Sequence, residues 1–229
     1  MTRKPYPTDL TDAQWQIIAP LIPPEKPRGR HRLVDMREII NAINYILVAG
    51  CSWRLLPHDL PPWQTVYSYF RRLERKGTWK DINDTLRRQL RVNEGKEEEP
   101  SAGIIDSQSV KTTEKGGVKG FDAGKKVKGR KRHILVDTMG LLLMVIVHSA
   151  SIQDRDGAKL LLEKVKQSRP RLQLIWADGG YAGKLIDWVK DVCGWLLSIV
   201  KRSDDIKGFQ ILPRRWVVER TFAWIGRCR

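Results

Sequence analysis

The order of apolar segments in the second half of this 229-residue chain most constrains its fold. Three β-type runs come first, and helical segments then alternate with two further β-type runs. Continuous apolar runs favour buried strands, whereas apolar residues three and four apart favour helices that cover a sheet. This order predicts a mixed α/β sheet with helices on its faces.

Eight elements are predicted in this half. Strands are expected over 103–110, 132–136, 141–147, 172–177 and 195–200, and helices over 156–167, 182–192 and 215–225. A hairpin turn at 137–140 joins the second and third strands. The five strands would follow the order of ribonuclease H-like folds, although a mixed sheet alone does not identify one.

The first 93 residues are expected to be helical. Helix starts are indicated by the capping pairs Thr11/Gln14 and Asp35/Glu38, by Pro61-Pro62 and by Thr78 with Asp81; stops are indicated by Pro23-Pro24, Gly50 and Gly77. The third helix is basic and aromatic, which is compatible with a helix-turn-helix domain. The alternative is a helical bundle whose arginines are merely solvated.

A short acidic segment separates the two halves. Residues 94–100 carry a net charge of −3 and contain glycine and proline. Such a composition is typical of a solvated linker. We therefore predict a helical DNA-binding domain over 1–93, a linker over 94–100 and an α/β domain over 101–229.

The chain is strongly basic, with 42 Lys+Arg, 26 Asp+Glu and a net charge of +16. A charge of +7 lies in residues 1–93, and another +7 lies in the glycine-rich segment 111–132. This excess points to a polyanionic partner, first of all nucleic acid.

Several other classes of protein are disfavoured by the sequence. The longest apolar run, 141–147, has seven residues, far fewer than a membrane span requires, and no secretory signal is evident. The three cysteines are scattered, which argues against a disulfide framework and a cysteine-rich zinc site. We expect a soluble intracellular protein.

Three carboxylates stand at unusual positions. Asp106 lies within an apolar strand, Asp178 follows a buried strand, and Glu219 shares a helix face with Trp216 and Phe222. Buried ionised acids are costly unless a cation meets them, so we expect all three to point inward and share divalent cations. Taken singly, each has a plainer explanation: a turn, a cap, or an ion pair of Glu219 with a neighbouring arginine.

Oxygen ligands of this kind suit Mg²⁺ or Mn²⁺. Two such ions about 4 Å apart can activate a water or 3′-hydroxyl in phosphodiester chemistry. Other candidates rank lower: Asp137 is expected in a turn, Asp154 and Asp156 at a helix start, and His133 and His148 in packing or DNA contacts.

Basic and polar residues in both halves are candidates for DNA contacts. The loop 26–32 could enter a minor groove, the helix over 63–77 could reach bases or phosphates, and segment 111–132 could neutralise phosphates. The candidates are Arg28, Arg30, Arg32, Gln64, Arg71, Arg72, Lys111, Lys119, Lys125, Lys126, Lys128, Arg130, Lys131, Arg132 and Arg215, with Lys115 in the same segment.

Several motifs resemble those of bacterial insertion-sequence transposases of the group conventionally numbered five. They are Ile-Ile-Asp106-Ser-Gln-Ser-Val-Lys, Ala-Asp178-Gly-Gly-Tyr-Ala-Gly, Arg-Arg-Trp-Val-Val-Glu219-Arg-Thr-Phe-Ala-Trp and, in the first half, Gly-Cys-Ser-Trp-Arg54-Leu-Leu-Pro. The resemblance spans nearly the whole chain. It implies a ribonuclease H-like catalytic domain with a DDE triad of Asp106, Asp178 and Glu219.

The resemblance also implies a function. Such an enzyme would bind terminal inverted repeats, cleave DNA with Mg²⁺ or Mn²⁺, and transfer the freed 3′-OH to target DNA. It would act as a homodimer in a synaptic complex, in the bacterial cytoplasm at the nucleoid. Around the third acid, Leu212 and Gly226 stand where relatives often have Tyr and Lys.

Two alternatives stay open. The chain stops ten residues after Glu219, so one alternative is a truncated, non-catalytic DNA-binding regulator of transposition. The other is a ribonuclease H-like nuclease or Holliday-junction resolvase, which would leave the helical first domain without a role.

Overall fold

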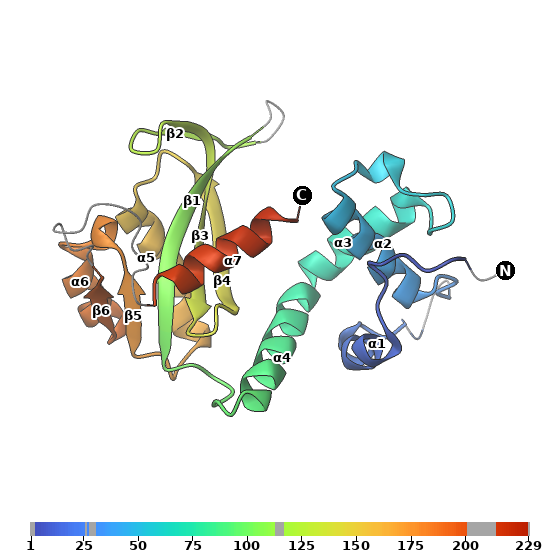
Figure 1. Ribbon diagram of the computed structural model, residues 1–229, viewed down its shortest axis with the longest axis horizontal. Coiled ribbons are helices and arrows are strands. Elements are labelled where there is room, and N and C mark those ends of the chain that lie inside the picture. The colour runs from blue at the N-terminus through green and yellow to red at the C-terminus, as the bar shows by residue number, and fades with distance from the viewer. Residues whose placement is uncertain (1–2, 26, 28–30, 113–116, 201–213, 229) are drawn as a thin grey trace. The chain divides into compact units, whose positions relative to one another are not determined.

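The computed structural model describes residues 3–25, 27, 31–112, 117–200 and 214–228. The chain divides into two compact units, Met1–Leu86 with Trp224–Arg229, and Arg87–Ala223. Within the described ranges there are seven α-helices and six strands (Figure 1). None of the helices in those ranges has both the length and the apolar content to cross a membrane.

The first unit is helical, as its sequence predicts. It contains α1 (Asp12–Ile18), α2 (Met36–Ala49), α3 (Trp63–Arg75) and the start of α4 (Thr78–Asn93). Buried side chains from these helices form one core, with Ile39, Ile43, Val66 and Leu73 at most 2% exposed. A helix-turn-helix role for these helices stays a prediction.

The helix boundaries of this unit follow from local capping. The capping box of Thr11 and Gln14 is confirmed. Asp35 caps α2 by accepting the Arg37 N–H at 2.8 Å, but Glu38 does not complete a second box because its carboxylate binds Arg3 at 2.7 Å. Gly50 ends α2 in the left-handed conformation (φ 66°), which glycine adopts without strain.

The second unit is built on one mixed sheet. Its strands are β1 (Ala102–Lys111), β2 (Gly120–Asp122), β3 (Val127–Asp137), β4 (Leu142–Ser149), β5 (Leu174–Ala177) and β6 (Leu196–Ile199). β1 pairs antiparallel with β3 and parallel with β5, β4 pairs with β3, and β6 is parallel to β5. The mixed α/β fold is confirmed, and the five longer strands lie side by side in the order β4-β3-β1-β5-β6.

The described part of the sheet has six strands, whereas the sequence predicts five. The extra strand, β2, and the first residues of β3 lie in the segment 111–132, which we expected to be a loop. Gly120 and Gly129 are paired across these strands. On its other side Gly129 faces β1, where a Cβ would lie 2.0 Å from the Val110 carbonyl oxygen, so only glycine allows β3 and β1 to approach so closely.

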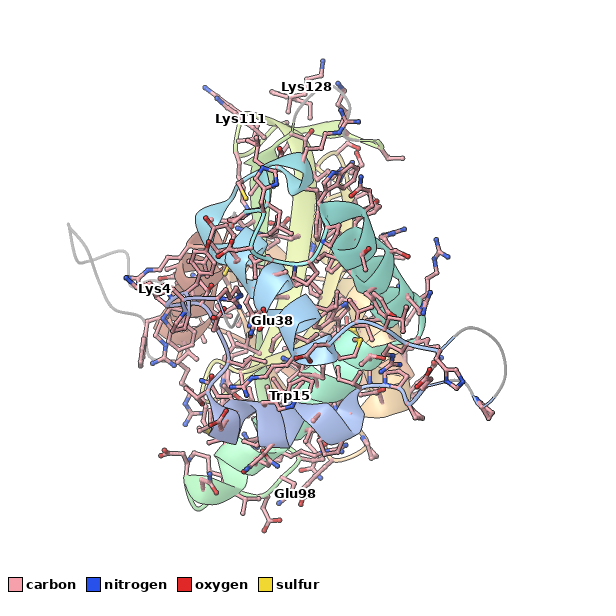
Figure 2. The ribbon with its side chains drawn as sticks, turned by 90° about the vertical axis from the view of Figure 1, so that its right-hand side faces the viewer. Lys4, Trp15, Glu38, Glu98, Lys111 and Lys128 are labelled. Carbon is pink, nitrogen blue, oxygen red and sulfur yellow. The ribbon has the colours of Figure 1, made fainter. Side chains whose placement is uncertain are left out.

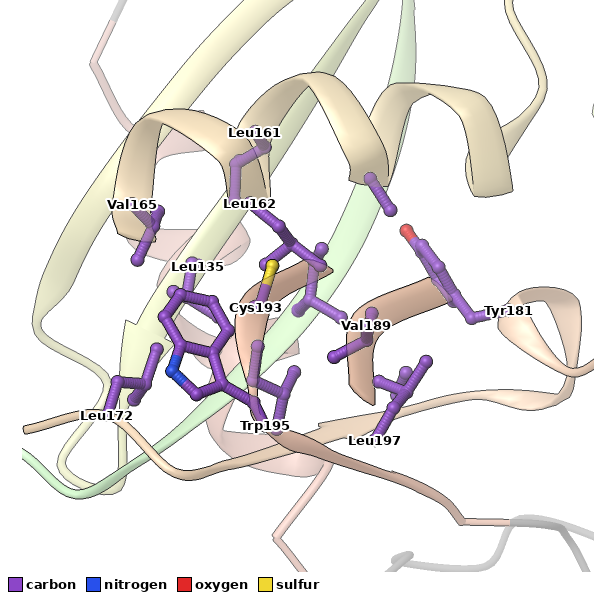
Figure 3. Packing of buried hydrophobic residues seen from close by; sticks show 14 of the residues in the cluster. Leu135, Leu161, Leu162, Val165, Leu172, Tyr181, Val189, Cys193, Trp195 and Leu197 are labelled. Carbon is purple, nitrogen blue, oxygen red and sulfur yellow. The ribbon is translucent and has the colours of Figure 1, made fainter. Parts of the chain in front are cut away.

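Helices cover both faces of the sheet (Figure 1). On one face, α5 (Asp154–Ser168) packs Leu161, Leu162 and Val165 into a core that also includes Trp195 and Leu197 (Figure 3). The helix α6 (Leu185–Trp188) continues as one π-helical turn and adds to this core. The other face carries α7 (Trp216–Gly226), which starts with buried Val217 and Val218.

The division between the units falls within α4, at Leu86/Arg87, not at the acidic segment 94–100. The C-terminal part of α4 and the acidic segment pack with the sheet unit. The buried Arg87 pairs with Glu99 at 2.9 Å, and Arg169 also contacts Glu99 at 3.5 Å. Glu99 is therefore held by basic side chains rather than solvated as part of a linker.

Candidate active site

Asp106 lies in the middle of β1. The strand alternates, so Ile105 and Ser107 face α5 while Asp106 faces the α7 side. One of its carboxylate oxygens, Oδ1, accepts the Ser107 N–H at 2.7 Å. The pKa of Asp106 is raised to about 6, chiefly by burial and also by the nearby Asp178, while the Ser107 N–H and the cations of Arg215 and Lys125 oppose the shift.

Asp178 stands at the carboxyl end of β5, the parallel neighbour of β1. Its Oδ1 accepts the Gly180 N–H at 2.8 Å and so caps the short turn Gly179–Tyr181. The carboxyl ends of parallel strands are where α/β sheets commonly hold their sites. In each aspartate, Oδ1 therefore accepts a backbone N–H, and Oδ2 can bind another partner.

Glu219 lies in the first turn of α7. We expected it to point inward, and this is wrong for most of its side chain, which is 54% exposed. The neighbouring Val218 is fully buried, so Glu219 sits at the rim of the buried face. Its Oε1 nevertheless reaches the two aspartates through a shared partner.

That partner is Arg215, one residue before α7. Its Nη2 lies 3.7 Å from Asp106 Oδ2, 3.4 Å from Asp178 Oδ2 and 3.6 Å from Glu219 Oε1. One guanidinium nitrogen therefore lies within 3.7 Å of carboxylates from β1, from the end of β5 and from α7. The three acids thus lie around one cation. Glu219 also forms an ion pair with a neighbouring arginine, which was the plainer expectation for this residue.

The donor set suits a divalent cation. Three carboxylate oxygens face one positive centre, and hard oxygen ligands are those preferred by Mg²⁺ and Mn²⁺. Among the described side chains, however, no three of His, Cys, Asp or Glu lie close enough to hold one metal ion as they stand. The guanidinium occupies the space between the acids.

A second polar network lies on the α5 face of β1, behind Asp106. Ser107 Oγ donates to Asp154 Oδ1 at 2.9 Å, and Lys125 Nζ donates to the Ser107 carbonyl at 2.9 Å. Lys131 Nζ pairs with Asp154 at 2.7 Å and with Asp122 at 3.1 Å. We missed this network because its members come from β1, β2, β3 and α5, and only the fold brings them together.

The network changes the expectation for Lys131. Its side chain is 4% exposed and bound to two carboxylates, so it has no free face for DNA. The strand alternation explains this: Lys131 faces α5, whereas Arg132 faces α7, where it lies over the Phe222 ring. We therefore correct Lys131 from a phosphate contact to a structural cation.

His133 and His148 form a stacked pair, with His133 Nδ1 2.9 Å from His148 Nε2. Burial lowers the pKa of His133 to about 3, so its ring is neutral at pH 7. His133 is fully buried, which confirms packing rather than DNA contact for this residue.

Most other basic candidates of the sheet unit are accessible. Lys111, Lys119, Lys125, Lys126 and Lys128 are exposed, although Lys125 also serves the network above. Figure 2 shows Lys111 and Lys128 at the same end of the sheet, both projecting outward. Arg130 and Arg132 are partly buried, and Arg132 Nε donates to Gln108 Oε1 at 3.0 Å.

In the helical unit, Gln64 and Arg72 of α3 are exposed, and Arg72 lies over the Tyr69 ring. Arg71 pairs with Glu74 on the same helix. Arg32 donates to the Pro23 carbonyl at 2.8 Å. The candidates Arg28, Arg30 and Lys115, and the motif position Leu212, lie outside the described residues.

Two protein families match this chain. Residues 97–229 match the family described as transposase DDE domain, and residues 10–83 match the family described as putative transposase of the IS4/5 family. A relative from Burkholderia cepacia, the uncharacterized 16.2 kDa protein of insertion element IS402, is 30% identical over 108 residues. That match covers 44% of this chain and 72% of the relative.

A solved structure is also similar, that of a piggyBac transposase synaptic complex with hairpin DNA. The TM-score is 0.40 at 15% identity, over 82% of this chain, which spans 47% of that transposase chain. The DDE domain match covers more than half of the chain and includes Asp106, Asp178 and Glu219. This chain belongs to the transposase DDE domain family and is an insertion-sequence transposase of the IS4/5 type.

Proposed function

We propose that this transposase cleaves DNA at the ends of its insertion sequence and joins the freed 3′-OH to target DNA, with Asp106, Asp178 and Glu219 as its catalytic triad. The observation that carries the proposal is the convergence of these three carboxylates on one cationic centre. The three acids belong to separate parts of the fold, and Asp178 lies at the carboxyl end of β5, where α/β sheets commonly hold their sites.

The chain's own residues would prepare this centre for a phosphodiester. Backbone N–H groups fix one oxygen of each aspartate, so their free oxygens point in set directions. Asp106, Asp178 and Glu219 would hold two Mg²⁺ or Mn²⁺ ions, and these would supply activation of the attacking water or 3′-hydroxyl and stabilisation of the leaving oxygen. Lys125 holds a positive charge beside Asp106 through its bonds to Ser107.

Two separate basic surfaces would bind the DNA. The first comprises Gln64, Arg71 and Arg72 of α3 together with the arm around Arg32, and would recognise terminal inverted repeats. The second comprises Lys111, Lys119, Lys126, Lys128, Arg130 and Arg132, and would neutralise phosphates near the cut. Since two element ends must meet, the active form would contain at least two copies of the chain.

The test uses labelled duplexes cut from both genomic flanks of the reading frame. The parent protein, Asp106→Asn, Asp178→Asn and Glu219→Gln are incubated with each duplex in Mg²⁺ or Mn²⁺, and nicked products are separated on denaturing gels. We expect nicking by the parent and a loss of at least about a thousandfold in each variant, because each acid belongs to one catalytic unit.

Asp191→Asn is the matched control, since Asp191 is an exposed aspartate on the π-helical turn after α6 and is not one of the three acids. It should nick like the parent, and all variants should still shift the duplex on native gels. Nicking by Asp178→Asn at the parent rate would refute the triad. A mobility shift with no nicking by the parent would instead support a DNA-binding regulator.

A further inference from the structure

We infer that Arg215 is a positioning residue that holds the three carboxylates together before divalent cations bind, leaves them when the cations bind, and is then available to a DNA phosphate. The inference rests on the proposed function of this site. It assigns one side chain two successive partners and thereby couples cation binding to phosphate binding.

The first step is that Arg215 is the partner common to all three acids. Its Nη2 lies within 3.7 Å of an oxygen of each. Glu219 is more than half exposed, and its contact with Arg215 spans one helical turn. Since repulsion would separate three negative groups, the guanidinium supplies the attraction that keeps Glu219 beside the two aspartates.

The charges in this group do not balance. One guanidinium against three carboxylates leaves the group with an excess of negative charge. A divalent cation satisfies such a group better than a single positive charge does. The guanidinium and a cation would compete for the same three oxygens, so we expect the cation to displace the guanidinium.

The third step is that Arg215 can move without unfolding its helix. It precedes the first residue of α7, and its carbonyl accepts the Val218 N–H at 3.1 Å, but its side chain can change rotamer without breaking that backbone bond. Its long side chain is 15% exposed, so the guanidinium has a route to solvent. Arginine binds phosphate oxygens through paired N–H groups, which makes a DNA phosphate its natural second partner.

Cation binding and phosphate binding must then each raise the affinity for the other. If cations release Arg215 to a phosphate, DNA must in turn raise the affinity for cations by the same factor. The enzyme would bind cations weakly until DNA is present, which limits metal-dependent cleavage chemistry to the DNA complex.

The first experiment follows the chemical reactivity of Arg215 in the full parent chain. Phenylglyoxal modification is measured by peptide mass spectrometry in EDTA, in Mn²⁺, and in Mn²⁺ with the flank duplex; the exposed Arg155 is the internal standard. We expect slow reaction in EDTA, reaction about tenfold faster in Mn²⁺, and renewed protection with DNA. Unchanged reactivity in Mn²⁺ would overturn the release, and no protection by DNA would overturn the phosphate step.

The second experiment measures Mn²⁺ binding without DNA, by the electron paramagnetic resonance signal of free Mn²⁺. Arg215→Gln should bind Mn²⁺ about tenfold more tightly than the parent because the competing cation is gone, and Arg215→Lys should fall between them. Arg155→Gln, which removes an equal charge elsewhere, should match the parent. Equal or weaker binding by folded Arg215→Gln would overturn the inference, and folding is checked by circular dichroism.

A third variant separates this inference from the function on which it rests. Asp178→Asn should lose Mn²⁺ binding if the acids form the cation site. If it binds Mn²⁺ like the parent, the proposed function itself fails. If Asp178→Asn loses binding but Arg215→Gln does not gain it, only the role of Arg215 fails.

Discussion

At the scale of single residues, the fold buries Asp106 where its ionised form is unfavourable. Burial raises its pKa from 3.8 to about 6, so the folded protein favours the protonated acid more than the unfolded chain does. The stability contributed by the protonated form is complete below about pH 4 and is lost as the pH rises through about 6. At neutral pH the ionised Asp106 therefore destabilises the fold.

Asp106→Asn removes this destabilising charge. We expect the metal-free variant to be more stable than the parent at pH 7.5 by up to about 3 kcal/mol, and the difference to vanish near pH 4. Urea unfolding in EDTA at the two pH values measures it. The exposed Asp191→Asn serves as control, and an Asp106→Asn variant that is less stable than the parent at pH 7.5 would contradict the reasoning.

Gly157 of α5 packs so closely against the pair of His133 and His148 that it leaves no room for a Cβ. A Cβ there would lie 2.5 Å from His133 Cε1 and 2.7 Å from His148 Nε2. We expect Gly157→Ala to lower the free energy of unfolding by about 1–3 kcal/mol, because overpacking outweighs the better helix propensity of alanine.

The matched control is Gly226→Ala at the end of α7, where nothing lies within 4 Å of the added Cβ. Thermal unfolding of the two variants, followed by circular dichroism, compares crowded and open helical glycines. A Gly157→Ala protein as stable as the Gly226→Ala protein would show that the histidine pair can move aside.

At the scale of elements, the turn between β3 and β4 is tied to α4 by a buried ion pair. Arg91 Nη1 lies 2.6 Å from Asp137 Oδ2, and the two side chains are 6% and 0% exposed. Asp137 also accepts the backbone N–H groups of Met139 and Leu141 at 2.9 Å. The turn expected from the sequence is confirmed, but its link to α4 was not foreseen.

Asp137→Ala should destabilise the protein by about 3–5 kcal/mol, since it leaves a buried arginine without its partner. The exposed pair Arg171–Glu97 provides the comparison: Glu97→Ala should change the stability by less than about 1 kcal/mol. Urea unfolding of both variants measures the contrast, and similar losses in the two would refute the assignment.

Elements were predictable where apolar spacing dominates. The strands around Leu135 and Ile175 and the helix that buries Leu161 and Val165 follow from local pattern. The strand β2 was missed because it has only three residues, and two of them, glycine and aspartate, have low β-propensity. Contacts between a buried lysine and acids on other elements cannot be predicted from local sequence, because only the fold brings these residues together.

The candidate site was predictable in part for the same reason. An acid inside an apolar strand is visible in sequence, so Asp106 stood out. The position of Arg215 between three acids was not, because spacing along α7 relates it only to Glu219. Its contacts with Asp106 and Asp178 depend on how the sheet and helix pack.

At the scale of the whole molecule, the net charge of +16 is divided between structural and exposed cations. Lys131 is buried between carboxylates, whereas Lys128 is exposed. Lys128→Gln should reduce the salt slope of DNA binding by about one counterion and leave stability unchanged.

Lys131→Met should instead lower the stability and leave the salt slope unchanged, because it removes the ammonium group that pairs with both Asp122 and Asp154 without removing a phosphate contact. Fluorescence anisotropy of a labelled flank duplex across a salt series gives the slopes, and urea unfolding gives the stabilities. A lower slope for Lys131→Met in folded protein would restore it to the DNA-binding surface.

The central claim is that three acids distant in sequence form one divalent cation site, and Fe²⁺-directed self-cleavage tests it most directly. The parent is loaded with Fe²⁺, treated with ascorbate and peroxide, and its backbone cuts are mapped by mass spectrometry. The account predicts cuts near Asp106, Asp178 and Glu219 that Mg²⁺ suppresses and Asp178→Asn abolishes. Cuts confined to other segments, or unchanged cuts in Asp178→Asn, would contradict it.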